Sequence, residues 1–566
     1  MYSTSDNCST IVKCVVIQLL WITLVRGEDF ESLLVQTTQG LVRGYKDTTE
    51  DIFTFYGIPY ATAPTGRNRY KAPLPAPVWM TPYEAVEDTI ICPQNSQRHT
   101  QLNFVGKKIN ENCLIANVYV PNIKDKNIPV VIYVHGGGYQ FGHGNSFSLK
   151  KLVSTENVIV VTFNYRLGIH GFLCLGTEDV PGNAGMKDQV ALLRWVKNNI
   201  ANFGGNPDDV TIAGFSAGSS SVDLLMISPI TKGLFTKVIP ESGASLAAFA
   251  VQTDPIETAK RVARQFNFTD VDNIYSLEEF YKSATLEQIT SDAFYDRKDS
   301  TFNFSPCVER VTAEEMFLGN SPFNILRNGD FKKVPLLYGF ANMEGLFRID
   351  FFESWKDDMN NMFADFLPPD LQFKNEDEKI KTANEIKYFY FGRKNVSENN
   401  VLGYVDFFSD VIFTYPVLKA AQLYSKAGHD QVYLYEYSFV DDDTPVVPYT
   451  TVRGATHCAQ TQAVIDGAGL EKISEDSITD DFREMKQTMR FIWGNFIKTG
   501  SPIPEGSQMP AWPAAGARGA PYMSLGRTIQ LRDDPLLAAR MAMWDNVYER
   551  HYRQPVPPPT NGFFYL

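Results

Sequence analysis

Short apolar runs alternate along this chain with longer segments of helical periodicity. Residues 128–134 and 158–163 are apolar at nearly every position, as strands covered on both faces are. Between residues 185 and 203, Val190, Leu193 and Val196 recur at the spacing of one helix face. This alternation predicts an α/β fold with a large, mostly parallel central sheet flanked by helices on both faces.

The same kinds of pattern mark the other elements that we expect. Residues 33–45 alternate loosely between apolar and polar positions around Gly40 and Gly44, as an antiparallel strand pair does. Further strand-like runs occur at 210–213, 237–239, 334–338 and 432–437, and helical patterns occur at 485–497 and 536–548. In such folds the active site gathers at the carboxyl ends of the parallel strands.

The first 27 residues have the features of a secretory signal peptide. Lys13 precedes an apolar run over residues 14–25, which ends just before Gly27. This run is shorter than a bilayer-spanning helix and matches the hydrophobic region of a signal peptide; the alternative is a buried helix. No later stretch approaches the length of a transmembrane helix, and no linker divides the chain. We therefore expect residues 28–566 to form a single secreted domain without a transmembrane anchor.

Composition narrows the classes of partner. The chain has 566 residues, of which 44% are hydrophobic, and a formal net charge of −13. A net negative charge argues against nucleic acid and anionic membrane surfaces as partners, so a small molecule is the expected partner. Nothing in the composition indicates an oligomeric state.

The cysteines agree with an oxidising compartment. Two of the seven lie in the signal segment, which leaves five: Cys92, Cys113, Cys174, Cys307 and Cys458. An odd number requires at least one free thiol. Cys92 and Cys113 flank a polar loop and form the expected disulfide, whereas the states of the other three stay open.

Three Asn-x-Ser/Thr sequons occur within residues 28–566, at Asn267, Asn303 and Asn395. Each is a candidate glycosylation site of a secreted protein. Pro306 directly follows the second sequon, which makes Asn303 the weakest candidate of the three.

The segment from Gly214 to Gly218 has the pattern Gly-x-Ser-x-Gly, with Ser216 at its centre. It follows the strand-like run at 210–213 and precedes residues 219–226, which can open a helix. A serine on a tight strand-to-helix turn projects its hydroxyl outward, and small flanking residues let the turn close. The pentapeptide alone is a weak signal, because it arises easily by chance in a chain with 39 glycines.

A second glycine-rich segment, residues 135–139, has the sequence His-Gly-Gly-Gly-Tyr and directly follows the strand-like run at 128–134. Three consecutive glycines allow backbone N–H groups to turn toward a common point; a flexible turn is the alternative. Ester hydrolysis develops negative charge on the carbonyl oxygen, and loss of one fixed N–H donor there costs roughly 3–4 kcal/mol. Loops of this type accompany the Gly-x-Ser-x-Gly turn in lipases and esterases.

Many separate motifs together carry a resemblance to a known family. Besides the two segments above, the matching stretches are residues 57–61, 111–114, 164–168, 182–185, 188–189, 198–200 and 203–207. In this order they resemble the type-B carboxylesterase and cholinesterase family over nearly all of residues 28–566. The overall pattern looks most like the secreted insect members, and it implies the α/β-hydrolase fold.

The resemblance implies a catalytic triad. Ser216 corresponds to the nucleophile, Glu344 to the triad acid and His457 to the base, in the chain order that this fold uses. In the implied mechanism, His457 removes the serine proton and Glu344 holds the imidazole. An acyl-enzyme forms and is then hydrolysed. The family needs no metal or cofactor.

The resemblance also implies supporting groups. The N–H groups of Gly137, Gly138 and Ala217 correspond to the donors that bind the oxyanion. Ser242 corresponds to a buried serine behind the triad, and a satisfied core hydroxyl is an equal alternative for it. Two further matches are the ion pairs Arg69–Glu111 and Arg166–Asp188, which hold loops near the sheet edge.

Two departures from the family pattern narrow the substrate. Cholinesterases have glutamate where this chain has Phe215, and they have a choline-binding tryptophan in the loop that here spans residues 93–112 and contains none. Choline esters are therefore not expected substrates, and Phe215 predicts an apolar pocket for uncharged esters. Juvenile hormone esterases usually have glutamine at this position, which counts against that activity without excluding it.

Cys458 directly follows His457, where the family usually has glycine or alanine. It is either a free thiol near the site or a small core residue, and we favour the core residue.

We therefore expect a secreted serine carboxylesterase that hydrolyses uncharged hydrophobic esters. One alternative is a slow-turnover scavenger that binds hydrophobic esters or organophosphates, which also needs Ser216. Another is an adhesion protein of this family that lacks the catalytic serine. The presence of all three triad residues argues against the adhesion protein.

Overall fold

The computed structural model describes residues 31–95, 104, 106–290, 297–467 and 475–559, so the expected signal segment, residues 1–27, lies outside it. Within the described residues, thirteen strands form one sheet: β1 Ser32–Thr37, β2 Gly40–Lys46, β3 Ile52–Pro59, β4 Tyr83–Glu84, β7 Ile115–Pro121, β8 Ile128–Val134, β9 Ile159–Phe163, β10 Gly205–Phe215, β11 Lys237–Glu241, β12 Leu336–Ala341, β13 Val432–Tyr437, β14 Tyr522–Leu525 and β15 Ile529–Arg532. Their order is β1-β2-β3-β7-β9-β8-β10-β11-β12-β13-β14-β15, with β4 beside β2. A separate pair consists of β5 Ile90–Ile91 and β6 Lys108–Ile109.

The sheet is parallel in its middle and antiparallel toward its edges. From β9 through β8, β10, β11, β12 and β13 to β14, every neighbouring pair is parallel. The pairs β1–β2, β2–β3, β3–β7, β7–β9 and β14–β15 are antiparallel, and the short strand β4 pairs with β2 in parallel. The α/β fold is confirmed, with a mixed sheet. The antiparallel pairs β1–β2, β2–β3 and β14–β15 have short connections, whereas the parallel pairs need long crossovers.

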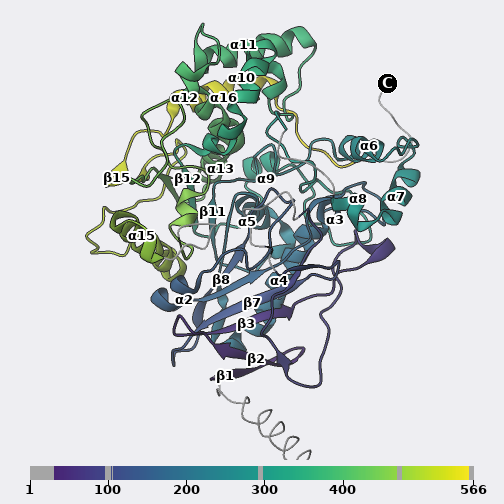
Figure 1. The fold of residues 1–566 in the computed structure, drawn as a ribbon, viewed down its shortest axis with the longest axis vertical. Coiled ribbons are helices and arrows are strands. Elements are labelled where there is room, and N and C mark those ends of the chain that lie inside the picture. Colours follow the sequence, from purple (N-terminus) through teal and green to yellow (C-terminus); the bar gives the residue numbers. More distant parts are fainter. Residues whose placement is uncertain (1–30, 96–103, 105, 291–296, 468–474, 560–566) are drawn as a thin grey trace, which may run out of the picture.

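Helices cover both faces of the sheet. They are α2 Lys150–Glu156, α3 Gly168–Phe172, α4 Ala184–Asn199, α5 Ala217–Ile227, α6 Pro255–Gln265, α7 Ile274–Ser283, α8 Leu286–Thr290, α9 Pro322–Asn328, α10 Phe352–Asn361, α11 Glu376–Phe391, α12 Val401–Ser409, α13 Tyr415–Lys426, α14 Ala459–Gln462, α15 Asp480–Thr499 and α16 Ala538–His551. Along β8, Val130 and Ile132 belong to an apolar cluster that includes residues of α4 and α5. The residues between and beyond them, Val131 and Tyr133, belong to a second cluster with residues of α2 and α15, two helices that lie side by side (Figure 1).

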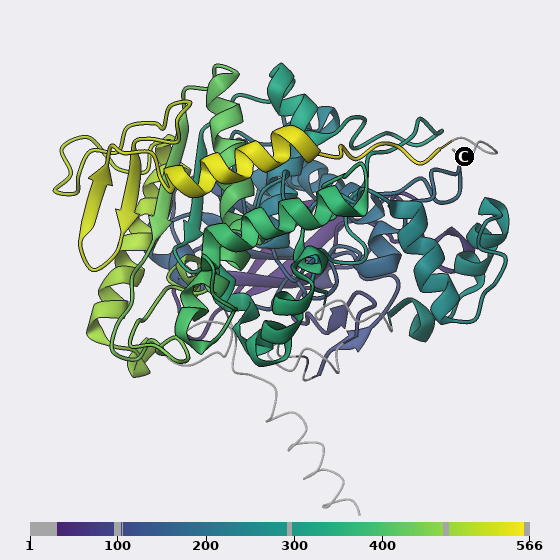
Figure 2. The same cartoon turned by 90° about the horizontal axis from the view of Figure 1, so that it is seen from above.

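The remaining helices extend the molecule beyond the sheet. In Figure 1, α10, α11, α12 and α16 gather at the end of the molecule opposite to β1 and β2. Figure 2 shows α16, in yellow, lying over the green helices of this group, and α13 packs against it. These helices carry the loops and side chains that lie against one side of the site described below.

One helix has the length and composition of a membrane span. Within the described residues, Glu398–Lys426 is the one segment that is long and apolar enough to cross a bilayer, but 83% of its most apolar window is buried inside the protein. The segment comprises a 3-10 helix η7 Glu398–Asn400, α12, a π-helical stretch η8 Asp410–Thr414, and α13. Its apolar side chains are therefore covered by protein, as those of a core helix are.

The predicted apolar runs lie within two or three residues of the observed strand ends, and β10 differs most. The run at 432–437 matches β13, whereas β10 begins five residues before the run at 210–213. The first half of β10 is polar and partly exposed, with a register irregularity between Gly205 and Val210. An apolar pattern cannot mark that half, because its side chains face solvent.

Two disulfides join four of the five cysteines that the structure describes. Cys92 and Cys113 are bonded as predicted, with their Cα atoms 5.0 Å apart. Cys174 is bonded to Cys307, 133 positions away, and Cys458 is free and buried. The pairing of Cys174 with Cys307 could not be read from the sequence, since spacing gives no indication of contacts over such a distance.

The structure removes one of the three glycosylation candidates. Asn303 is only 3% exposed, and its amide oxygen accepts hydrogen bonds from Arg261 at 2.6 Å and Arg297 at 2.9 Å. A side chain held in this way leaves no room for a glycan. Asn267 and Asn395 are exposed and stay predictions.

Candidate active site

Ser216 lies on the turn between β10 and α5, with φ 55° and ψ −123°. A non-glycine residue in this conformation is strained, and the turn holds it through a hydrogen bond from the Ser216 N–H to the Glu241 carbonyl oxygen at 2.8 Å. A Cβ atom on Gly218 would lie 2.2 Å from the Val134 carbonyl oxygen. The predicted strand–turn–helix is therefore present, and its second glycine is required because α5 begins in direct contact with the end of β8.

The glycine-rich loop lies against this turn. A Cβ atom on Gly136 would be 2.7 Å from the Phe215 carbonyl oxygen, and Gly137 has φ 106°, a conformation that glycine favours. Within the described part of the chain, the N–H groups of Gly137 and Gly138 donate to no main-chain or side-chain acceptor. The N–H of Ala217, the first residue of α5, has no acceptor inside its helix. Three donors are thus available beside Ser216.

Glu344 and His457 meet across two loops that follow β12 and β13. The Glu344 carboxylate is fully buried, and its Oε2 lies 2.5 Å from Nδ1 of His457. Its Oε1 accepts hydrogen bonds from the Ala341 N–H at 2.8 Å and from the Ser242 hydroxyl at 2.5 Å. These contacts fix the carboxylate, which in turn orients the imidazole and leaves Nε2 as its second reactive atom.

Main-chain contacts hold the two loops together. The Met343 N–H donates to the Ala455 carbonyl oxygen at 3.0 Å, and the Ala455 N–H donates to the Asn342 side chain at 3.0 Å. Because Met343 precedes Glu344 by one residue and Ala455 precedes His457 by two, this pair of bonds sets the distance between carboxylate and imidazole.

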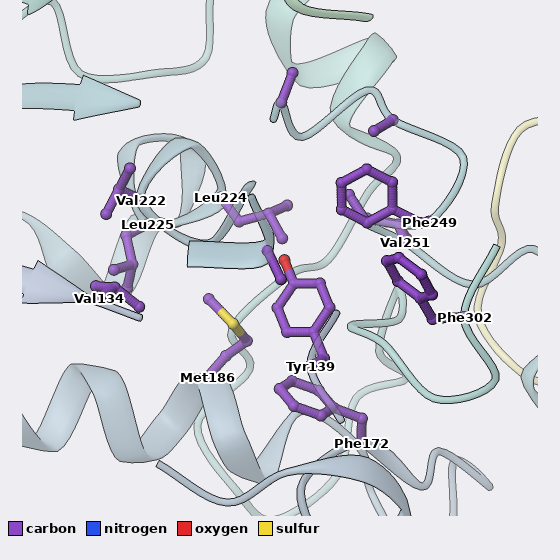
Figure 3. Close-up of a cluster of buried hydrophobic side chains, with 14 of the residues drawn as sticks. Val134, Tyr139, Phe172, Met186, Val222, Leu224, Leu225, Phe249, Val251 and Phe302 are labelled. Atoms are coloured by element: carbon purple, nitrogen blue, oxygen red, sulfur yellow. The ribbon is translucent and has the colours of Figure 1, made fainter. Parts of the chain in front are cut away.

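Aromatic rings enclose the imidazole. Phe413 stacks on it with ring centroids 4.0 Å apart and an angle of 18°, and Phe347 lies 5.1 Å away. Phe413 comes from the π-helical stretch η8, for which the sequence gives no signal. From Phe413 the rings continue to Phe249 at 5.7 Å and then to Phe302 at 5.2 Å. Figure 3 shows these last two rings beside each other, with Tyr139 over Phe172 nearby.

Nε2 of His457 contacts a thiol in this structure. Cys458 Sγ lies 3.3 Å from it. The expectation that Cys458 is a small core residue is only half right, because the side chain is buried but its sulfur lies at the histidine. Within the described residues the Ser216 hydroxyl makes no hydrogen bond.

A buried polar group connects the two sides of the site. Glu241, at the end of β11, is fully buried, and its carboxylate accepts hydrogen bonds from the hydroxyls of Tyr435 and Thr461, each at 2.6 Å. Burial raises the pKa of Glu241 to about 7. The next residue, Ser242, accepts a hydrogen bond from the Gln460 amide at 2.5 Å and donates to Glu344. Sequence reasoning identified Ser242 but missed Glu241 and Gln460, which no local pattern distinguishes from surface residues.

Phe215 belongs mainly to the core beneath the serine turn. Its ring is 9% exposed and packs against Phe147, with centroids 5.0 Å apart, and Tyr133, at 6.2 Å. The two ion pairs expected from the family motifs are present: Arg69–Glu111 at 2.8 Å and Arg166–Asp188 at 2.6 Å. The second pair is fully buried, where geometry and additional hydrogen bonds are needed to offset desolvation.

A sequence model of the carboxylesterase family matches residues 31–544. The chain belongs to the carboxylesterase family. Esterase FE4 of Myzus persicae is 34% identical over 499 residues, covering 84% of this carboxylesterase and 86% of the relative. A juvenile hormone esterase of Heliothis virescens is 31% identical over 510 residues, covering 85% and 88% respectively.

A solved structure supports the same assignment. The juvenile hormone esterase of Manduca sexta, with OTFP covalently attached, superposes with a TM-score of 0.81 at 28% identity, covering 92% of this chain and all of that one. The fold is therefore that of the α/β-hydrolases, and the carboxylesterase is an enzyme that hydrolyses carboxylic esters.

Proposed function

We propose that this chain is a secreted serine carboxylesterase that hydrolyses uncharged, hydrophobic esters through an acyl-enzyme. The observation that carries the proposal is the 2.5 Å contact between Nδ1 of His457 and Oε2 of Glu344, next to a strained serine turn. A carboxylate bound at Nδ1 leaves Nε2 free of a proton, which is the tautomer that a general base needs.

In the proposed reaction, Nε2 of His457 takes the proton of Ser216 as the hydroxyl oxygen attacks the ester carbonyl carbon. The oxyanion that forms is bound by the N–H groups of Gly137, Gly138 and Ala217. The imidazolium, stabilised by Glu344, then protonates the departing alcohol. Water attacks the acyl-enzyme in the same way and releases the acid.

The aromatic surroundings of the histidine favour an uncharged substrate. The rings of Phe347, Phe413, Phe249 and Phe302 form a continuous apolar surface that begins at the imidazole. A charged acyl or alcohol group would lose hydration against these rings without gaining an ion pair. Hydrophobic esters gain from the same contact.

Two disulfides in one chain favour an oxidising compartment, which supports secretion directed by residues 1–27. Expression with this segment in eukaryotic cells should deliver the protein to the medium, without the segment. Retention of the intact chain inside the cells would contradict secretion while leaving the proposed activity untouched.

Juvenile hormone hydrolysis is a second candidate activity, favoured by the TM-score of 0.81 with the Manduca sexta enzyme. A series of p-nitrophenyl esters from acetate to decanoate, with juvenile hormone measured beside it, separates the two. A kcat/KM for the hormone that exceeds every simple ester by 100-fold or more, roughly 2.7 kcal/mol of selective binding, would favour the hormone.

The decisive experiment compares the wild type with Ser216→Ala on p-nitrophenyl butyrate. Ser220→Ala is the matched control: its hydroxyl is buried on the next turn of the same segment and lies beside the side chain of Tyr139. We expect turnover from the wild type and control and none from Ser216→Ala. A stoichiometric burst without turnover would favour a scavenger, and equal activity of Ser216→Ala would refute the proposal.

A further inference from the structure

The nitrogen that should receive the serine proton is already in contact with another donor. Cys458 Sγ lies 3.3 Å from Nε2 of His457. A thiol is a weak hydrogen-bond donor, and the unprotonated nitrogen of a neutral imidazole is an acceptor. With Nδ1 bound to Glu344, the Ser216 hydroxyl and the Cys458 thiol compete for the same lone pair.

The thiol is not needed to orient the ring. Glu344 holds Nδ1 at 2.5 Å, and Phe413 stacks on the face of the imidazole with centroids 4.0 Å apart. These two contacts define both the direction and the plane of the ring. A third contact at Nε2 adds no further orientation, so its main effect is to occupy the reactive atom.

The backbone at this position favours glycine. Cys458 has φ 63° and ψ 21°, in the left-handed region where a side chain is unfavourable. The turn that leads from His457 into α14 would therefore form more easily without a side chain. The thiol is held beside the histidine against this local preference.

Cys458 is placed as a donor rather than as a nucleophile. Burial, together with the carboxylates of Glu344 and Glu241, raises the pKa of the thiol well above its usual range. The sulfur therefore keeps its proton at neutral pH, whereas attack on an ester requires the thiolate. The titratable groups that interact with this thiol are Glu344 on η5 Glu344–Phe351, Glu241 on β11 and Tyr133 on β8, and the Ser242 side chain and the Ser216 backbone also interact with it. From η8, the Phe413 ring stacks on His457.

We propose that Cys458 acts on the ester hydrolysis through His457: its thiol occupies Nε2 of His457 in the resting enzyme and must release it before the imidazole accepts the Ser216 proton. This inference rests on the proposed roles of Ser216 and His457. It implies two resting arrangements of the neutral imidazole, one bound to the thiol and one open to the serine.

The competition has a specific kinetic signature. The thiol binds only the neutral imidazole, so it lowers the plateau of kcat/KM at high pH by a certain factor. It also lowers the apparent pKa of the acidic limb, by the logarithm of that factor. Below the limb, where His457 is protonated, the thiol has no effect. Removing the thiol should therefore leave the acidic limb unchanged and raise only the plateau.

The test measures kcat/KM for p-nitrophenyl butyrate between pH 5 and 9 in Cys458→Ala, Cys458→Gly and the wild type. We expect both variants to overlay the wild type at low pH and to exceed it on the plateau by roughly 2- to 10-fold, the range of one hydrogen bond. The apparent pKa should rise by the logarithm of that ratio. Cys458→Ser keeps a hydrogen-bond donor, so its plateau value of kcat/KM should return toward that of the wild type.

Ser300→Gly is the matched control. Ser300 is also buried, has φ 63° and lies outside the site, so its substitution makes the same backbone change without touching His457. Its profile should overlay the wild type at every pH. If Cys458→Ala does not fold, Cys458→Gly carries the test, because glycine suits the left-handed backbone.

Three outcomes would overturn the inference. The kcat/KM of the Cys458 variants could equal that of the wild type at every pH, it could have a lower plateau, or it could differ from the wild type by the same factor at every pH. The last would indicate a structural role. Activity of Ser216→Ala equal to the wild type would instead refute the proposed function. An inactive Ser216→Ala with unchanged Cys458 variants refutes only the role of the thiol.

Discussion

The serine side and the histidine side of the active site are built in different ways. Ser216 and the glycine-rich loop lie at the ends of the adjacent strands β10 and β8, and their geometry comes from backbone conformation and from the absence of side chains. Glu344 and His457 lie on loops 113 positions apart in sequence and are joined by side-chain hydrogen bonds. The first side is encoded by contiguous motifs, whereas the second depends on contacts that span the chain.

This difference predicts how substitutions on each side should affect stability and activity. The serine side has no space to relax, so even a single added methyl group should disrupt it. The histidine side is a chain of hydrogen bonds, so substitutions there should weaken function and leave the fold intact. Three substitutions test this contrast, in order of decreasing effect.

Gly218→Ala should have the largest effect. Its Cβ would lie 2.2 Å from the Val134 carbonyl oxygen and 2.8 Å from that of His135, and both are backbone atoms that cannot move aside easily. We expect destabilisation by at least about 3 kcal/mol and loss of esterase activity, measured by thermal unfolding and turnover. Gly516→Ala, an exposed glycine whose nearest atom is 3.6 Å away, is the control. A stable, active Gly218→Ala enzyme would show that this side is not rigid.

Glu344→Gln should abolish most activity without unfolding the protein. The amide keeps the shape of the carboxylate but can present N–H to Nδ1, which favours the wrong imidazole tautomer and removes the charge that stabilises the imidazolium. A fall in kcat of roughly 10³- to 10⁴-fold is expected, with a melting temperature within a few degrees of the wild type. Full activity would remove Glu344 from the proposed triad, and unfolding would contradict the contrast between the two sides.

Glu241 lies between the two sides and should make stability depend on pH. Its main-chain oxygen binds Ser216, and its carboxylate binds Thr461 beyond His457. Burial raises the folded-state pKa to about 7, above the ordinary value of about 4.3. The stabilisation from this protonated carboxyl is therefore complete below about pH 4 and is lost as pH rises through 7, by roughly 3 kcal/mol in total.

Urea unfolding of the wild type and Glu241→Gln at pH 5, 6, 7 and 8 measures this contribution. The variant should lose less stability between pH 5 and pH 8, because an amide does not titrate. Glu505→Gln, at an exposed position, should keep the wild-type slope. Equal slopes in all three proteins would mean that Glu241 does not titrate in this range.

The sequence by itself determined the fold class, the strand–turn–helix around Ser216 and the glycine-rich loop. These features depend on local chemistry: apolar runs that must be covered, and glycines where a Cβ atom would meet backbone. The polar first half of β10 escaped the same reasoning, because its solvent-facing residues have no apolar period.

Only the tertiary structure decided which side chains complete the site. The pairing of Cys174 with Cys307, the stacking of Phe413 from a π-helical turn on His457, and the hydrogen bonds of Ser242 with Gln460 and Glu344 join segments between 44 and 218 positions apart. Cys458 shows the same limit at short range. The sequence shows that it follows His457, but it does not show that the sulfur contacts Nε2. Contacts of this kind are set by packing of the whole chain, because local propensity does not specify which distant side chains meet.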